Sequence, residues 1–236
     1  MSASDLLRRL AVPGGLALWL ALAAGCENGS WSKSAHAGSY YAPANHSGDA
    51  VLPSSIRRVV LLPLCGGQVV PESSVTELDP VVAAALQQQN RFEIISLSRD
   101  DCIRLFGASE LSSVAALPAN FMATLRQEYA ADAVLLVDIT VFHAYRPLSI
   151  GFRAKLATVQ EARLVWTFDN LFSAADPMVI NSARRHVLTA GMPDTPADQS
   201  AAVLQSPSRF AAYAAETMFA TLPPVSAGPN PTGANR

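Results

Sequence analysis

The segment between residues 133 and 168 places the strongest limit on the fold of this chain. Ala133 to His143 is a long apolar run, Ser149 to Thr158 alternates apolar residues with Gly151, Arg153 and Lys155, and Arg163 to Phe168 alternates again. A period of two is typical of strands. Short turns near residues 145–147 and 160–162 join the three segments, so we expect a three-stranded antiparallel meander. One face of the first strand is expected to carry Leu135, Val137, Ile139 and Val141, and the other Val134, Leu136, Asp138, Thr140 and Phe142.

Two strand–helix units are expected before this meander. Arg57 to Leu64 and Phe92 to Leu97 are short apolar runs typical of buried strands. Asp79 followed by Pro80 predicts a helix from there to about Gln89. Ser98 with Asp101 three residues later predicts a second helix that ends at Gly107. A third helix is expected over Asn120 to Ala130.

The remaining elements complete an α/β (α+β) fold. Helices are expected near 177–186 and 208–222, with a loop over 189–205 between them. The order predicts a mixed sheet of about five strands, in which two βα units are followed by the meander and helices pack on the sheet.

The N-terminus resembles a bacterial lipoprotein signal. Arg8 and Arg9 precede an uncharged run from Leu10 to Ala24, which is too short to span a bilayer but suits a secretory signal. Leu22-Ala23-Ala24-Gly25-Cys26 resembles the lipobox, in which the cysteine receives a diacylglyceryl group and becomes the first residue of the mature chain. The alternative is a plain secreted protein with Cys26 incidental. Glu27 favours the outer membrane over the inner, so we expect a lipid anchor on the periplasmic side.

Composition sets the domain organisation. We expect a signal peptide over 1–25, a disordered tether over 26–54 rich in Ser, Ala, Gly and Asn, a single domain over 55–222, and a disordered tail over 223–236. Removing the signal takes two of the 17 basic and one of the 19 acidic residues, which leaves a net charge of −3. No basic stripe remains, so nucleic-acid binding is not expected.

Three stretches of the expected domain resemble the TolB N-terminal/CsgG-like family. They are RFEIISLSR at 91–99, ADAVLLVDIT at 131–140 and LVW at 164–166. The family usually has Gly where Asp138 stands and a D-x-x-T-G hairpin where Val159 to Arg163 stand. Relatives serve secretion, exopolysaccharide export or activation of peptidoglycan synthases, and some form rings. The resemblance therefore implies envelope protein partners and, as one option, a homo-oligomer.

Two groups of residues are candidate sites. The turn Tyr145-Arg146-Pro147, with Phe142 beside it, carries residue types that dominate protein interfaces, and the alternative is a locally packed turn. Cys65 and Cys102 each follow a predicted strand, so adjacent parallel strands would allow a disulfide. Two inert buried thiols are the alternative. No Cys/His spacing predicts a metal site, and we expect no cofactor.

These features are compatible with three functions. We expect a non-enzymatic accessory or assembly subunit of an export or cell-wall machine that binds protein partners. The alternative is a periplasmic small-ligand-binding module with a cleft at the strand ends near Cys65–Gly67 and Ser98–Asp101. A hydrolase using Asp100, Asp101 or His143 has no supporting motif. We do not expect a membrane pore, because Arg153 and Lys155 would share one face of the hairpin.

Overall fold

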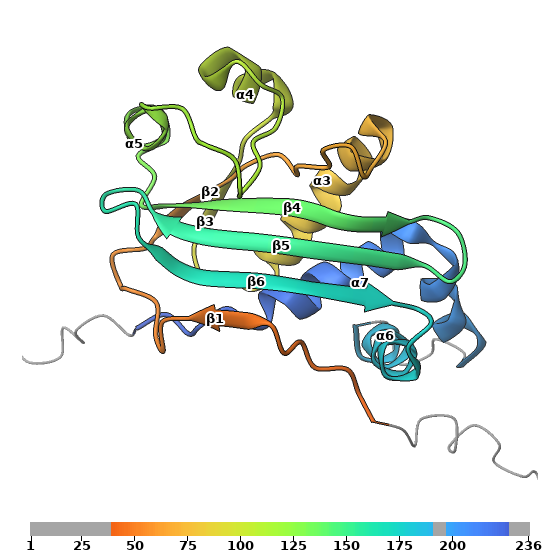
Figure 1. The fold of residues 1–236 in the computed structure, drawn as a ribbon. Helices are drawn as coiled ribbons and strands as arrows, with labels where there is room; N and C mark the ends of the chain where they lie inside the picture. The colour runs from red at the N-terminus through yellow and green to blue at the C-terminus, as the bar shows by residue number, and fades with distance from the viewer. Residues whose placement is uncertain (1–38, 191–196, 227–236) are drawn as a thin grey trace, which may run out of the picture. The chain divides into compact units, whose positions relative to one another are not determined.

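The computed structural model describes residues 39–190 and 197–226. The predicted signal peptide, the lipidation site Cys26 and the rest of residues 1–38 and 227–236 lie outside the described residues. The described elements follow in chain order (Figure 1): β1 His46–Gly48, β2 Arg58–Leu61, α3 Glu72–Gln87, β3 Glu93–Ser96, α4 Arg99–Phe106, α5 Phe121–Tyr129, β4 Ala133–His143, β5 Ser149–Thr158, β6 Leu164–Ser173, α6 Pro177–Ala190, the 3₁₀ helix η2 Ala197–Gln205, and α7 Pro207–Phe219.

A six-stranded mixed sheet forms the centre of this fold, in the order β1-β6-β5-β4-β2-β3. β2 runs parallel to both β3 and β4, while β4, β5 and β6 form the antiparallel meander and β1 adds to its edge. The prediction of a mixed sheet with helices packed on it is confirmed, with one strand more than expected. β4 and β5 have the predicted bounds, whereas β6 continues beyond Phe168 to Ser173.

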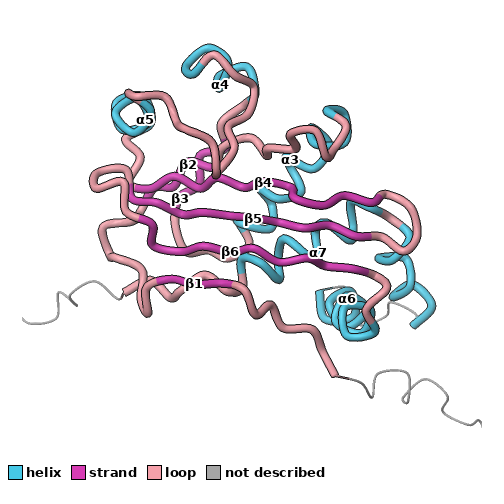
Figure 2. The backbone as a smooth tube through the Cα atoms, in the orientation of Figure 1, coloured by secondary structure: helices cyan, strands magenta, loops and turns pink. Residues whose placement is uncertain are grey.

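Helices cover the two faces of the sheet unequally (Figures 1 and 2). The larger hydrophobic cluster joins α3, α6, η2 and α7 to one face, and Leu135, Val137 and Ile139 of β4 point into it. The smaller cluster joins α4 and α5 to β2 and β4 on the other face, where Val134 and Leu136 are buried. β4 is therefore buried on both sides, which explains its nearly continuous apolar sequence.

A β-bulge in β4 places the residues after it on other faces of the sheet than we expect from the sequence. The register between β4 and β5 shifts between Ile139 and Val141, so one extra residue enters β4 and the alternation of faces reverses. As a result Phe142 packs against the same cluster that contains Ile139, not on the opposite face. Gly151 stands opposite the bulge, and a Cβ atom there would lie 2.4 Å from Thr140 Oγ1.

The start of α3 also differs from the expectation. The helix begins at Glu72, so Pro80 lies in its interior and Asp79 is not its N-cap. Asp79 instead accepts the backbone N–H of Leu64 at 2.8 Å. Pro80 and Thr76 are both exposed, so water can satisfy the carbonyl that the proline leaves without a donor. The predicted caps of α4 are confirmed: Ser98 Oγ accepts the N–H of Asp101, and Gly107 is left-handed with φ 77°.

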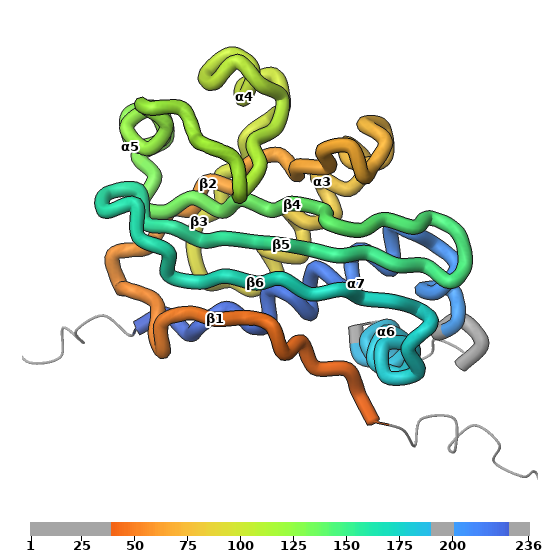
Figure 3. Tube along the Cα trace, in the orientation of Figure 1, coloured from red at the N-terminus to blue at the C-terminus, as the bar shows by residue number. Residues whose placement is uncertain are grey.

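Parts of the segments expected to be a tether (26–54) and a tail (223–236) pack on the domain in the structure. β1 pairs with β6, Leu52 is fully buried, and the Leu52 N–H donates to Pro224 O while Ser226 N–H donates to Leu52 O. Figure 3 shows the N-terminal segment running along β6 to α6. Its order comes from hydrogen bonds and one buried leucine, which leave no hydrophobic period in the sequence.

Candidate functional site

A polar cluster, Asp79, Arg99, Glu110 and Cys65, fills the carboxyl ends of β2 and β3. Arg99 Nε donates to Asp79 Oδ2 at 2.8 Å and its Nη1 to Glu110 Oε2 at 3.0 Å, and Nη2 donates to Leu64 O at 2.9 Å. The Arg99 side chain is only 15% exposed, and the two carboxylates are 26% exposed. We call this set the strand-end cluster.

Glu110 connects the strand-end cluster to the turn after β2. Its Oε1 accepts the backbone N–H of Gly67 at 3.0 Å and the thiol of Cys65 at 3.4 Å. Burial raises the pKa of Cys65 to about 11, and the negative charges of Glu110 and Asp138 act in the same direction. Cys65 therefore stays a protonated donor at neutral pH, without the reactivity of a thiolate.

The predicted Cys65–Cys102 bridge does not form in the structure. Both residues are free thiols. β2 and β3 are adjacent and parallel, as the prediction required, but the two thiols have different surroundings. Cys65 bonds to Glu110 above the strand ends, whereas Cys102 is fully buried in the α4–α5 cluster. Burial also raises the pKa of Cys102.

The strand-end cluster leaves little room for the small ligand that we weighed as the alternative function. The hollow beside it, which Asp79 lines together with Leu64 and Leu97, measures about 110 Å³, whereas ligand pockets generally measure about 300–1,000 Å³. The polar side chains of the strand-end cluster form hydrogen bonds with one another. Asp101 is likewise held by Ser98 and Arg104, which is a cap at the start of α4. Among residues 39–190 and 197–226, no group of three His, Cys, Asp or Glu side chains is placed to hold a metal.

The pKa of Glu110 predicts how stability responds to acid. Burial raises this pKa, but the N–H groups of Gly67 and Gly66, Arg99 and Cys65 together hold it below the usual 4.5. The ionised form is therefore favoured in the folded state, and its contribution is complete above pH 4.5 and lost as the pH falls through the lowered pKa. We expect Glu110→Gln to lower the free energy of unfolding at neutral pH, with the difference from wild type shrinking below pH 4.5. Urea titrations across this range would show it, and a difference that stays constant with pH would contradict it.

Asp138, a buried carboxylate in the middle of β4, fixes the loop between α4 and α5. Asp138 is 6% exposed and accepts the Ser113 N–H at 2.9 Å, the Ser113 hydroxyl at 2.7 Å and the Ser112 hydroxyl at 3.2 Å. Lys155 Nζ donates to Ser113 O at 2.7 Å. The loop is thus held against β4 and β5, and it forms one border of the exposed part of the sheet.

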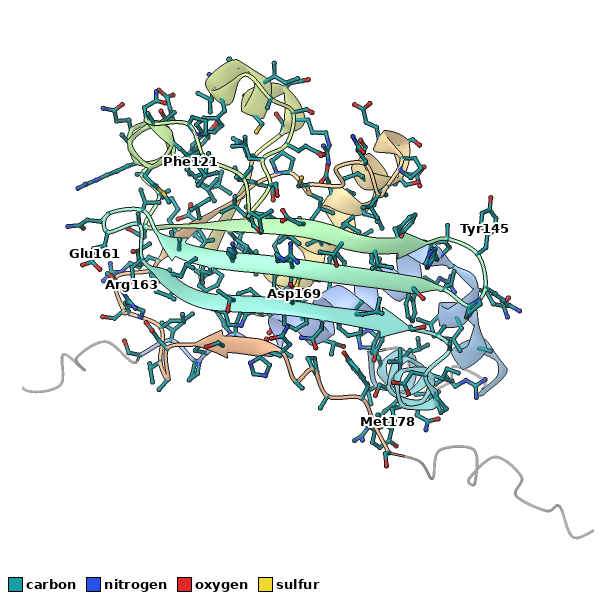
Figure 4. The ribbon with its side chains drawn as sticks, viewed as in Figure 1. Phe121, Tyr145, Glu161, Arg163, Asp169 and Met178 are labelled. Atoms are coloured by element: carbon teal, nitrogen blue, oxygen red, sulfur yellow. The ribbon has the colours of Figure 1, made fainter. Side chains whose placement is uncertain are left out.

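The open sheet face is the part of β5 and β6 that none of the described helices covers. Its centre is the ion pair of Arg153 Nε with Asp169 Oδ2, 2.8 Å apart, flanked by Lys155 and Thr167. A shallow hollow of about 340 Å³ lies over these residues and is bordered by β1 and Val114. Val114 is 63% and Leu171 49% exposed. Figure 4 shows Asp169 on this face.

The hairpin end is the turn between β4 and β5 together with the neighbouring parts of α6 and η2. Tyr145 is 88% exposed, and Arg146 and Pro147 are also exposed. Figure 4 shows Tyr145 beyond the end of the sheet, at the opposite end from Glu161. Phe142, the fourth predicted residue, is half-buried against the core. His143, at the end of β4, is exposed.

A hollow of about 400 Å³ lies beside this turn. It is lined by Arg146, Pro147, Leu148, Ala174, Arg184, Ala201, Leu204 and Gln205. Two of these residues are arginines and none is acidic. Arg184 Nε is buried and has no hydrogen-bond partner within the described part of the chain.

Comparisons with known proteins give the following findings. No protein-family model matches this sequence, and no curated protein sequence matches it. Among solved structures, the PelC dodecamer from Paraburkholderia phytofirmans aligns with a TM-score of 0.43 and 10% identity, over 75% of this chain and 94% of the other. Lipoprotein GNA1162 from Neisseria meningitidis aligns with a TM-score of 0.37 and 15% identity, over 49% and 79%. The LpoB C-terminal domain from Salmonella enterica aligns with a TM-score of 0.31 and 17% identity, over 48% and 80%.

These likenesses are coarse. Each of the three has a TM-score below 0.5 and an identity below 25%, so none of them assigns a family, an activity or an assembly state to this chain. No helix in residues 39–190 or 197–226 is long and apolar enough to cross a membrane.

Proposed function

We propose that this protein is a bacterial envelope lipoprotein, anchored through a lipid on Cys26, that acts as a non-catalytic accessory or assembly subunit by binding protein partners. The N-terminal sequence Leu22–Cys26 supports the anchor. We place the protein on the periplasmic side, at the outer membrane, and expect an export or cell-wall machine to be its partner. A second copy of the chain, in a homo-oligomer, is another candidate partner.

The open sheet face is the observation that carries the partner-binding proposal. One face of the sheet is buried under α3, α6, η2 and α7, and α4 and α5 cover only the β2–β4 side of the other. The uncovered part carries the Arg153–Asp169 ion pair, a shallow hollow bordered by exposed Val114, and exposed Leu171 two residues after Asp169 on the same strand. Exposed apolar groups around such a patch mark protein interaction sites, and the rigid meander holds the patch in place.

Site-specific photo-crosslinking in the bacterial envelope tests this proposal. A photoreactive residue at Thr167 is expected to give discrete protein adducts, whereas one at Glu77, exposed on α3 over the opposite face, is expected to give none. Leu171→Asp should lower the yield at position 167, because a carboxylate would have to enter the interface. Equal adducts at both positions, or none at Thr167, would overturn the proposed surface.

A further inference from the structure

We infer that the hairpin end rests on an anionic phospholipid surface, and that this contact orients the tethered protein with the end that carries Glu161 pointing away from the bilayer. The inference rests on the proposed lipid anchor. In this inference the surface around Tyr145 contacts a lipid bilayer, whereas the sequence alone predicts a protein partner there. Three observations carry it.

The chain enters the fold at the hairpin end. Ser39, the first described residue, has its carbonyl bonded by Asn181 Nδ2 at 3.4 Å, and the Tyr41 N–H donates to Ser182 Oγ at 2.7 Å. Asn181 and Ser182 belong to α6 and lie within one turn of Arg184 and Arg185. Ser39, the described residue nearest to Cys26 in the chain, therefore lies against α6 within about one turn of these two arginines.

The length of the intervening chain keeps this end near the anchor. Thirteen residue steps separate Cys26 from Ser39. Such a segment spans about 45 Å when fully extended, and about 20 Å on average as a flexible coil. The ten residues of β5 extend about 33 Å along the sheet. The average reach is shorter than the sheet, so it favours the hairpin end as the part nearest the bilayer and the end that carries Glu161 as the part farther away.

The side chains at the hairpin end suit a membrane interface. Arg146 and Arg184 border a hollow that is otherwise mostly apolar and has no acidic residue in its lining. Arg185 lies over the ring of Tyr40, 4.6 Å from its centroid, and Arg209 is exposed near the start of α7. Guanidinium groups bind phosphates in a bidentate manner, and an exposed tyrosine such as Tyr145 is typical of the headgroup region. Arg184 lines this hollow, and its Nε atom has no hydrogen-bond partner among the described residues.

The opposite end provides a matched control. Arg57 and Arg126 are both exposed, and Arg126 lines a hollow with Asp132, Glu161 and Arg163. Asp132 bonds the N–H of Arg57, which places Arg57 at the same end. Arg57→Gln/Arg126→Gln removes as much positive charge as Arg146→Gln/Arg184→Gln, but from the end that we expect to face away from the bilayer.

Vesicle flotation of the mature chain with Cys26→Ser, which carries no lipid of its own, tests the inference. We expect binding to phosphatidylcholine vesicles that contain phosphatidylglycerol, weakened by salt, and little binding to phosphatidylcholine alone. Each arginine at an anionic surface contributes about fivefold in affinity, so Arg146→Gln/Arg184→Gln should weaken binding more than about tenfold. The Arg57→Gln/Arg126→Gln control lies several Debye lengths from the surface and should stay within about twofold of the parent chain.

Several outcomes would overturn the inference. They are equal binding with and without phosphatidylglycerol, equal losses in the two double variants, or no binding at all while a photoreactive residue at Tyr145 captures a protein. If Cys26 is acylated in cells but the chain does not bind vesicles, this inference fails and the proposed function stands. If Cys26 carries no lipid in cells, the proposed function fails and the inference fails with it.

Discussion

Cys26→Ser is expected to abolish the incorporation of labelled fatty acid completely. A serine hydroxyl is not the thiolate to which the diacylglyceryl group is transferred, and the two remaining cysteines cannot replace it. Cys102 is fully buried, and Cys65 is bonded to Glu110 with its pKa raised to about 11. Two acyl chains are needed for stable attachment, at about 0.8 kcal/mol for each buried methylene. The measurement is the recovery of labelled palmitate on the protein after growth with the label.

The matched control for this experiment removes the other thiols. Cys65→Ser/Cys102→Ser is expected to keep the full label, because neither position is an acceptor. A chain whose Cys26→Ser variant still takes up the label, or whose double variant loses it, does not carry its anchor at position 26.

Arg99→Met is expected to give the largest loss of stability of any single change in the strand-end cluster, about 3 kcal/mol in the free energy of unfolding. Removing one partner of a buried ion pair leaves uncompensated charge, which costs about 3–5 kcal/mol for fully buried groups. Here two carboxylates, Asp79 and Glu110, lose their guanidinium partner while each is 26% exposed, which places the cost at the lower end. Urea denaturation at neutral pH would measure it.

Two further variants separate the lost ion pairs from the lost packing. Arg104→Met removes an exposed arginine from the same helix, where the partner is Asp101 on the surface, and should change the unfolding midpoint little. Asp79→Asn keeps an oxygen for the Leu64 N–H, so Arg99→Met/Asp79→Asn should lose less than the sum of the single changes. Strict additivity would mean that Arg99 does not stabilise the fold through its ion pair with Asp79.

The sequence predicts the meander well because each strand is long and has clear alternation. Ala133–His143 and Ser149–Thr158 are the observed bounds of β4 and β5. The bulge near Thr140 was not predictable, because an inserted residue leaves an apolar alternation looking continuous when both faces are buried. The Asp79–Pro80 pair has the pattern of a helix start, but here the Asp79 carboxylate bonds to Arg99 and to the backbone of Leu64, and the helix begins eight residues before Pro80, at Glu72.

The candidate sites also include features that the sequence predicts and features that it does not. Tyr145, Arg146 and Pro147 are exposed because they form a short turn between two long strands. Phe142 does not share this exposure, because the bulge turns its side chain toward the core. The strand-end cluster joins residues that lie 20 and 11 positions apart along the chain. The hairpin end joins Arg146 to Arg184. No local pattern links such pairs, because only the packing of the helices on the sheet brings them together.

Mass spectrometry of the N-terminal peptide of the protein purified from bacterial envelopes tests the central claim most directly. The proposed lipoprotein predicts a mature chain that begins at Cys26 and carries a diacylglyceryl group on its sulfur. A chain that begins elsewhere, or a Cys26 recovered with a free thiol, would contradict the account.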